Sequence, residues 1–286
     1  MSINALTQIA PLGRSRPVIA LRRFADFLHD LVRSREVILT MTHRDFTSRY
    51  LGSCLGLVWA FIQPLANILV IWFVFQVGFK AAPINDFPFI LWLSAGMVPW
   101  SFFSEAFSRA TGAVVEKSCV VKQVCFRASM LPIVAILSTL IVHVAFIGVL
   151  FAMFAYYGYL PGIYTLQIPY YLGATVVMLL GLSWLTSSLT VFLRDVPQIV
   201  SLVLQFGFWA TPIFWLPEQM PENIRWLITL NPMHYIVAGY RHAFIDQTWF
   251  WEDLAGGCVF WIFTLICFLV GAVVFTRLRP HFADAL

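Results

Sequence analysis

Runs of apolar residues long enough to form membrane-crossing helices recur along this sequence of 286 residues. A helix needs about 20 mostly apolar residues to cross the roughly 30 Å hydrocarbon core of a bilayer. Six such spans are predicted, and they cover residues 53–79, 87–107, 130–157, 169–193, 197–216 and 254–276. The pattern therefore predicts an all-α membrane protein with six transmembrane helices.

A different pattern precedes the first span. Between residues 21 and 32 the apolar side chains recur on one helical face, while Arg22, Arg23, Asp26 and Asp30 fall on the other. A helix of this kind lies along the membrane surface with its apolar face in the lipid. We therefore divide the chain into an N-terminal arm with an amphipathic interface helix, residues 1–52, and a six-helix membrane domain, residues 53–286.

The connection between the fifth and sixth spans, residues 217–252, is too long for a turn and too apolar for a solvated loop. Pro221 suits the start of a short helix ending near Leu230, because proline is favoured at the first helical position. Asn231 and Pro232 then read as the N-cap and first residue of a second helix ending near Ile245. Neither helix is long enough to span. The pair is predicted to form a re-entrant hairpin on the outer side, or alternatively to rest on the bilayer surface.

Composition supports a membrane protein, since 60% of the residues are hydrophobic and 11% are charged, against about 25% charged in soluble domains. All but three of the 18 Lys and Arg residues fall in the N-terminal arm, in the second-to-third and fourth-to-fifth connections, or in the tail. Positive residues are retained on the cytoplasmic side. The sequence thus predicts a multi-pass protein of the cytoplasmic membrane with both termini in the cytoplasm, and it gives no reason to expect nucleic-acid binding.

Residues that carry chemistry are sparse. The sequence contains no G-x-x-x-x-G-K-[ST] phosphate loop and no H-E-x-x-H motif, so neither ATP hydrolysis, a cofactor nor a metal site is expected in this chain. Glu105 and Arg109, one turn apart near the end of the second span, are interpreted as a structural pair. His143, deep in the third span, is expected to bond to a neighbouring helix. Energy for active transport would have to come from another subunit.

Aromatic residues run through the depth of the first and fifth spans. Rings at an interface are ordinary membrane anchors, but these continue beyond the interfaces. They either pack against protein or lipid, or line a channel in which flat rings stack weakly on a passing substrate. The candidate channel-lining residues are Trp59, Trp72, Phe73, Phe75, Phe206, Phe208 and Trp209.

Several short motifs follow one another in a fixed order along the chain. They are Arg44-Asp45-Phe46, Arg49-Tyr50-Leu51-Gly52-Ser53, Leu55-Gly56, Trp59, Pro64-Leu65, Leu193-Arg194-Asp195-Val196, Gln198, Asn231-Pro232, Tyr240-Arg241 and Phe282-Ala283-Asp284. Their order and spacing resemble the permease subunits of type-2 ABC exporters that carry polysaccharides or polyol phosphates, such as O-antigen, capsule or teichoic acid. The resemblance extends from about residue 37 to the last residue. One segment departs from the pattern: Phe126 is followed by Arg127-Ala128-Ser129, where the family commonly has Phe-Pro-Arg-Glu.

The resemblance implies a homodimer of permeases on two nucleotide-binding ATPase subunits, which would bind ATP and Mg²⁺. It favours docking over a merely solvated surface for the cytoplasmic charged residues. The candidate docking residues are Arg44, Asp45, Lys117, Lys122, Arg127, Arg194 and Asp195. The outer-side helices are predicted to form a gate with Trp226, Asn231, Pro232, Tyr240 and Arg241, although Arg241 could instead extend to the interface.

The predicted function is export of a lipid-linked, O-antigen-like polysaccharide across the cytoplasmic membrane. Two alternatives stay open at this point. The exporter could carry a small lipid or drug, or the chain could be an integral-membrane enzyme acting on lipid carriers. An enzyme would need clustered acids or histidines, and the sequence shows none.

Overall fold

The computed structural model describes residues 34–50, 56–80, 87–118, 128–160 and 162–286. Within these residues the chain folds into helices and turns, without strands, as predicted. The predicted interface helix at 21–32 lies outside the described residues. The helices are α2 (Arg35–Tyr50), α3 (Trp59–Trp72), α4 (Phe89–Glu116), α6 (Met130–Tyr156), α7 (Ile168–Thr190), α8 (Val196–Ala210), α9 (Glu222–Thr229), α10 (Pro232–Arg241), α11 (Leu254–Leu278) and α12 (Phe282–Ala285).

Four continuous helical segments are long and apolar enough to cross a membrane: Gly56–Gly78, Met130–Tyr156, Ile163–Thr190 and Leu254–His281. They match the predicted first, third, fourth and sixth spans. The first contains α3 and a π-helical end, Phe73–Gly78. α4 has 28 residues, but its Trp, Pro and Ser content lowers its hydropathy. α8 is apolar but has only 15 residues.

The predicted fifth span, 197–216, extends six residues beyond the C-terminal end of α8, which stops at Ala210. Thr211 adopts an extended conformation with ψ 132°. The residue before a proline is forced away from helical geometry, and Pro212 has no N–H to donate. The helix that covers the predicted second span, by contrast, is longer than that span, since α4 continues past residue 107 to Glu116.

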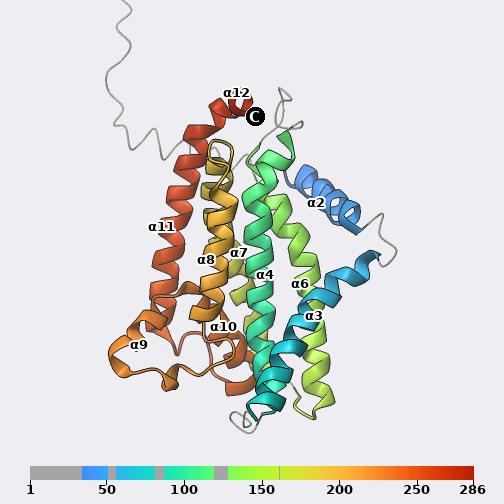
Figure 1. The fold of residues 1–286 in the computed structure, drawn as a ribbon, viewed down its shortest axis with the longest axis vertical. Helices are drawn as coiled ribbons and strands as arrows, with labels where there is room; N and C mark the ends of the chain where they lie inside the picture. The colour runs from blue at the N-terminus through green and yellow to red at the C-terminus, as the bar shows by residue number, and fades with distance from the viewer. Residues whose placement is uncertain (1–33, 51–55, 81–86, 119–127, 161) are drawn as a thin grey trace, which may run out of the picture.

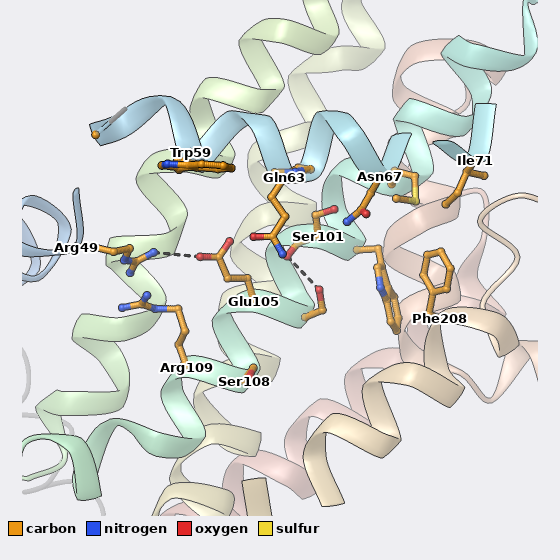
Figure 2. A pocket seen from close by; sticks show the side chains of 16 residues that line it. Arg49, Trp59, Gln63, Asn67, Ile71, Ser101, Glu105, Ser108, Arg109 and Phe208 are labelled. Carbon is orange, nitrogen blue, oxygen red and sulfur yellow. Dashed lines mark hydrogen bonds and ion pairs between the residues drawn. The ribbon is translucent and has the colours of Figure 1, made fainter. Parts of the chain in front are cut away.

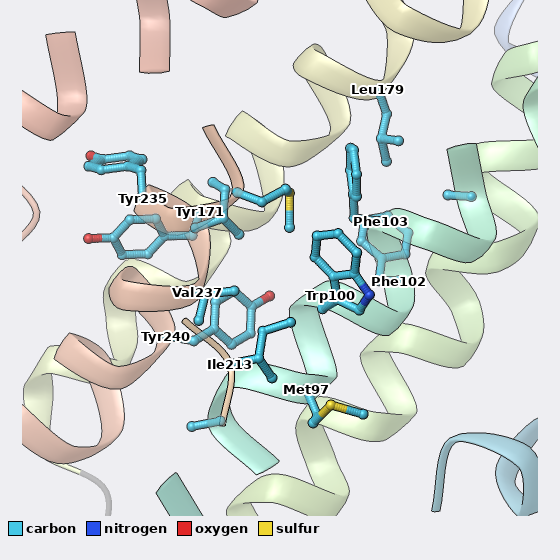
Figure 3. Close-up of a cluster of buried hydrophobic side chains, with 14 of the residues drawn as sticks. Met97, Trp100, Phe102, Phe103, Tyr171, Leu179, Ile213, Tyr235, Val237 and Tyr240 are labelled. Carbon is cyan, nitrogen blue, oxygen red and sulfur yellow. The ribbon is translucent and has the colours of Figure 1, made fainter. Parts of the chain in front are cut away.

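α4 is the centre of the bundle (Figure 1) and contacts α3, α6, α7, α8 and α10. Its aromatic residues enter a buried cluster with residues of α7 and α10, seen in Figure 3. Trp100 and Phe103 of α4, Tyr171 of α7 and Tyr240 of α10 each expose 7% or less of their surface. Burial of such large rings is the main apolar contribution to the core.

α7 and α11 approach each other very closely because glycines face each other between them. A Cβ atom built on Gly181 would lie 2.6 Å from the backbone of Phe268, and one built on Gly271 would overlap the carbonyl oxygen of Gly181. Small residues allow membrane helices to pack backbone against backbone. These two helices therefore form one tightly joined pair.

The two ends of the bundle carry different elements (Figure 1). α2 and α12 lie toward one end, and α9 and α10 lie at the other. Asn231 caps α10 as predicted, accepting a hydrogen bond from the Met233 N–H at 3.0 Å, with Pro232 following it. α10 is largely buried against α4 and α7, whereas α9 is largely exposed.

Candidate functional site

A cavity of about 800 Å³ lies along the bundle between α3 and α4 (Figure 2). Arg49 from the end of α2 lines it at one end, and Phe208 of α8 contributes to its wall. Ile71 marks how far the cavity extends along α3. An opening of this size inside an otherwise apolar bundle is the principal candidate site.

Polar groups from α3 face the cavity. Gln63 and Asn67 are four residues apart and therefore lie on the same helical face. Between them, Pro64 has no N–H and cannot donate to the carbonyl of Ala60, which also lines the cavity. This wall thus offers two amide side chains to the cavity.

The α4 wall carries a stripe of hydroxyl groups. Ser101, Ser104 and Ser108 recur every three or four residues and all line the cavity. Ser104 Oγ donates to the Ser101 carbonyl at 3.2 Å. Glu105 and Arg109 continue the same stripe toward Arg49. The cavity therefore changes from hydroxyl and amide groups along its length to charged groups at one end.

Aromatic rings complete the lining. Trp59 of α3 and Trp100 of α4 contribute indole rings, and Phe208 packs beside Trp100 with ring centroids 5.9 Å apart. Of the aromatic residues predicted to line a channel, only Trp59 and Phe208 line this cavity. Phe75 packs between Phe89 and Phe214. Trp72 is half-buried against the core, and Phe73, Phe206 and Trp209 are exposed on the outside of this chain.

The charged end of the cavity is a network that joins α2 to α4 and α6. Asp45 lies 3.1 Å from the guanidinium of Arg109 and 2.5 Å from the Lys117 ammonium. Arg49 reaches Glu105 at 3.1 Å and donates to Ser138 of α6 at 3.0 Å. Glu105 thus pairs with Arg49 of α2, whereas the sequence analysis paired it with Arg109.

Asp45 is the least exposed charged residue of this network, with 11% of its side chain exposed. Burial alone would raise the pKa of its carboxyl group. The hydrogen bond and the positive charge of Lys117, with contributions from Ser138 and Arg109, outweigh that effect and lower the pKa below the ordinary value of 3.8. Asp45 therefore holds its negative charge under physiological conditions and stabilises the cations around it.

Comparison with known proteins identifies the family of this chain. Residues 36–245 match the ABC-2 type transporter family. This chain belongs to that family. The matched range includes every residue of the cavity and of the charged network, together with α10. An ABC-2 permease is the membrane subunit of a transporter, and not an enzyme.

Relatives of this ABC-2 permease include proteins named for O-antigen export. The O-antigen export system permease protein RfbA of Klebsiella pneumoniae is 26% identical over 252 residues, covering 88% of this chain and 95% of that protein. A protein of the same name from Myxococcus xanthus is 27% identical over 222 residues, covering 77% and 84%. The similarity thus extends over most of both chains.

The predicted docking residues of the permease fall into two groups. Arg44 on α2 and Arg194 and Asp195 in the turn between α7 and α8 are exposed. Asp45 and Lys117 instead contact each other inside the chain. Lys122 and Arg127 lie outside the described residues. Asp195 occupies the N-cap position of α8, but its side chain makes no capping hydrogen bond. The docking role itself stays a prediction.

The predicted outer-gate residues also differ in environment. Trp226 of α9 is 59% exposed. Tyr240 is buried, and its hydroxyl lies 2.8 Å from Nε2 of His143, which confirms that His143 bonds to a neighbouring helix. Arg241 is buried and does not extend to the interface, while its role in a gate stays a prediction. Its guanidinium donates to the carbonyls of Pro212 and Ile213.

The polar stripe of the ABC-2 permease was not among the predicted sites. Neither Ser101, Ser104 and Ser108 nor Gln63 and Asn67 were singled out from the sequence. Their spacing was a usable signal, because hydroxyls recurring at three and four residues share one helical face. That Gln63 and Asn67 meet this stripe depends on how α3 packs on α4, and no local pattern determines that packing.

Proposed function

We propose that this chain is the transmembrane subunit of an ATP-driven exporter that moves a lipid-linked polysaccharide across the cytoplasmic membrane. The observation that carries the proposal is the 800 Å³ cavity, whose hydroxyl, amide and indole groups suit a sugar chain. Sugars present hydroxyls for hydrogen bonds and C–H faces for aromatic rings. The names of the relatives in Klebsiella and Myxococcus support the same class of cargo.

The proposal includes a separate ATPase as energy source. The sequence contains no phosphate-binding loop, so ATP and Mg²⁺ would bind to the partner subunit. Exposed Arg44, Arg194 and Asp195 are the proposed contacts for that subunit. The purified chain alone is expected to hydrolyse no ATP, and co-expression with its ATPase is expected to give a stable complex. Nucleotide hydrolysis by the isolated chain would contradict this part of the proposal.

A second copy of the chain is the proposed partner within the membrane. Apolar side chains of α3 and α8 are exposed beside the cavity, among them Leu69, Val70, Val203 and Phe206. α8 is about 22 Å long at 1.5 Å per residue, which is short for a lipid-facing span. Two copies related by a two-fold axis would cover these faces and enclose a path that one chain leaves open.

The proposed topology has six spans, with α4 and α8 added to the four long apolar segments. Both termini would lie in the cytoplasm, because the basic connections then share one side. α9 and α10 would lie on the outer side and close the path when no substrate is present. In this arrangement Arg241 would hold the closed hairpin by its contacts to the carbonyls of residues 212 and 213.

Deletion of the gene in its host tests the proposed cargo. The expected result is loss of surface polysaccharide together with accumulation of a polyprenyl-linked polymer in the cytoplasm, both reversed by the intact gene. If a small lipid accumulated while the surface polysaccharide stayed normal, the chain would still be an exporter, but its cargo would be that lipid. Normal export of both polysaccharides and lipids in the deletion strain would overturn the proposal.

A further inference from the structure

Two arginines from different helices meet at the charged end of the cavity. Arg49 of α2 and Arg109 of α4 both line the cavity, and 16% and 30% of their side chains are exposed. Figure 2 shows their guanidinium groups on the same side of Glu105. A guanidinium group presents several N–H donors in a plane and is well suited to bind phosphate oxygens.

The two carboxylates of this network have different roles. Asp45 is held by Arg109 and Lys117 and is nearly buried, with 11% of its side chain exposed. Glu105 has 42% of its side chain exposed and lies on the cavity wall itself. Glu105 can therefore turn away from Arg49 into the cavity. Movement of Asp45 would instead break its contacts with three cations, Arg49, Arg109 and Lys117, inside the protein.

Three cations and two carboxylates contact one another in this network. Arg49, Arg109 and Lys117 face Asp45 and Glu105, and the carboxylate of Glu116 also acts on Arg109. If Glu105 turns aside, the arginines lose a counter-charge in a partly desolvated position. A multiply charged anion that takes its place restores the balance and gains charge-assisted hydrogen bonds.

The remainder of the cavity indicates what would be attached to the anion. Ser108 and Ser104 lie next to Arg109 toward the N-terminus of α4 and also line the cavity. A polar chain attached to the anion would therefore contact these hydroxyl groups. Leu57, Val58 and Ile62 are exposed apolar residues at the same end of the first span. A hydrocarbon tail could remain beside these residues in the bilayer while the charged group occupies the cavity.

We propose that the charged end of the cavity binds the phosphate or diphosphate group that joins a lipid tail to the transported sugar, with Arg49 and Arg109 as ligands and Glu105 as a displaceable counter-charge. This inference rests on the proposed function, since it assigns the headgroup of the same cargo. The polar stripe then contacts the first sugars behind the headgroup.

Binding to the purified full-length chain in nanodiscs tests the site directly. The probes are farnesyl diphosphate, uncharged farnesol and inorganic pyrophosphate, and the measurement is equilibrium binding with radiolabelled ligand. Farnesyl diphosphate is expected to bind, farnesol is not, and pyrophosphate is expected to compete with the lipid. Tighter binding of the lipid than of pyrophosphate would identify the lipid headgroup as the source, whereas farnesol binding as tightly as its diphosphate would overturn the proposal.

Matched variants separate the site from general attraction of anions. Arg109→Gln is expected to weaken farnesyl diphosphate binding by about tenfold or more, because a charged hydrogen-bonding partner is lost. Arg279→Gln removes the same charge from an exposed tail position and is expected to leave binding unchanged. Equal effects of the two variants would overturn the site.

A further variant covers the case in which Arg109→Gln fails to fold. Glu105→Gln removes the competing carboxylate from an exposed side chain, and tighter diphosphate binding is expected. Weaker or unchanged binding in a stable Glu105→Gln protein would contradict the exchange of Glu105 for the ligand. If the chain binds farnesyl diphosphate but deletion of its gene leaves polysaccharide export intact, the proposed cargo is wrong and the binding site is supported. If export requires the chain but neither Arg109→Gln nor Glu105→Gln changes diphosphate binding, the binding site is wrong and the proposed cargo is supported.

Discussion

The guanidinium of Arg241 lies over the indole ring of Trp92, 3.5 Å from its centroid. The same group donates to the carbonyls of Pro212 and Ile213 at 2.7 and 2.6 Å. One side chain of α10 thereby joins α4 to the non-helical segment that follows α8. A buried cation in this position satisfies carbonyls that Pro212 and the end of the helix leave without partners.

Arg241→Gln is expected to lower the stability of the permease by about 2 kcal/mol, because hydrogen bonds to a charged group and the ring contact are lost together. Thermal unfolding in detergent measures the effect. Arg277→Gln at an exposed position of α11 is the control and should leave the unfolding temperature unchanged. An Arg241→Gln protein as stable as this control would show that the contacts do not hold the segment.

Gly181→Ala is expected to destabilise the chain strongly, because the added methyl group would lie 2.6 Å from the backbone of Phe268, which has no flexible end to move aside. Gly173→Ala on the same helix meets nothing within 4 Å and should be neutral or stabilising by up to about 1 kcal/mol, since alanine favours helix. Detergent unfolding of the pair is the measurement. Equal unfolding temperatures would contradict the close approach of α7 and α11.

Asp45→Asn is expected to release α2 from the bundle, since Arg109 and Lys117 lose their common partner. Hydrogen exchange of α2 amides should rise in this variant but not in Arg44→Gln, which changes an exposed neighbour. The lowered pKa gives the pH dependence. The contribution of Asp45 to stability is complete when the pH is above about 3.8, the ordinary pKa of the carboxyl group. It is lost as the pH falls below that value. Equal α2 exchange in Asp45→Asn and wild type at pH 7 would disprove this attachment.

Trp59→Leu is expected to reduce polysaccharide export, because the cavity loses a flat ring while apolar bulk remains. Phe73→Leu, on an exposed ring of the same span that does not line the cavity, should export normally. Surface polysaccharide is measured at matched membrane levels of both variants. A defect in Phe73→Leu as large as that in Trp59→Leu would instead favour a path along the whole aromatic face.

Arg194→Ala is expected to weaken attachment of the ATPase without affecting membrane insertion, because the side chain is exposed in the short turn before α8. Co-purification of the ATPase with the variant measures attachment. Arg279→Ala, exposed in the tail, provides a control for loss of one positive charge. Full recovery of the ATPase with Arg194→Ala would place the docking surface elsewhere.

Those parts of the fold that depend on local patterns were predictable from the sequence. The third span was predicted at 130–157 and α6 covers Met130–Tyr156, because an uninterrupted apolar run has clear limits. Asn231 and Pro232 start α10 as expected, since capping is a property of neighbouring residues. α4 continues beyond the predicted end at residue 107, and the charges on this extension have a distant partner: Arg109 and Lys117 both contact Asp45, more than sixty residues earlier in the chain.

Properties of the candidate site were harder to predict for the same reason. The burial of Arg241 depends on two carbonyls that α8 exposes by ending early, and the sequence alone does not place them beside α10. The cavity depends on the separation of α3 from α4. Side-chain types indicated aromatic and basic residues, but only the packing shows that Trp59 and Phe208 share a cavity while Trp72 does not.

The glycine contact between α7 and α11 has a mechanical consequence. Helices joined backbone to backbone move together, so that this pair acts as a rigid frame for α4. The first span is held differently, since only 6% of its most apolar stretch is buried within the chain, compared with 50% for the corresponding stretch of the segment that contains α7. Within a single chain, the α4 wall of the cavity is therefore held on several sides, whereas the α3 wall is held by fewer contacts. The bore of the cavity is set mainly by the position of α3, and a small tilt of that single helix would widen or narrow it without repacking the rest of the bundle.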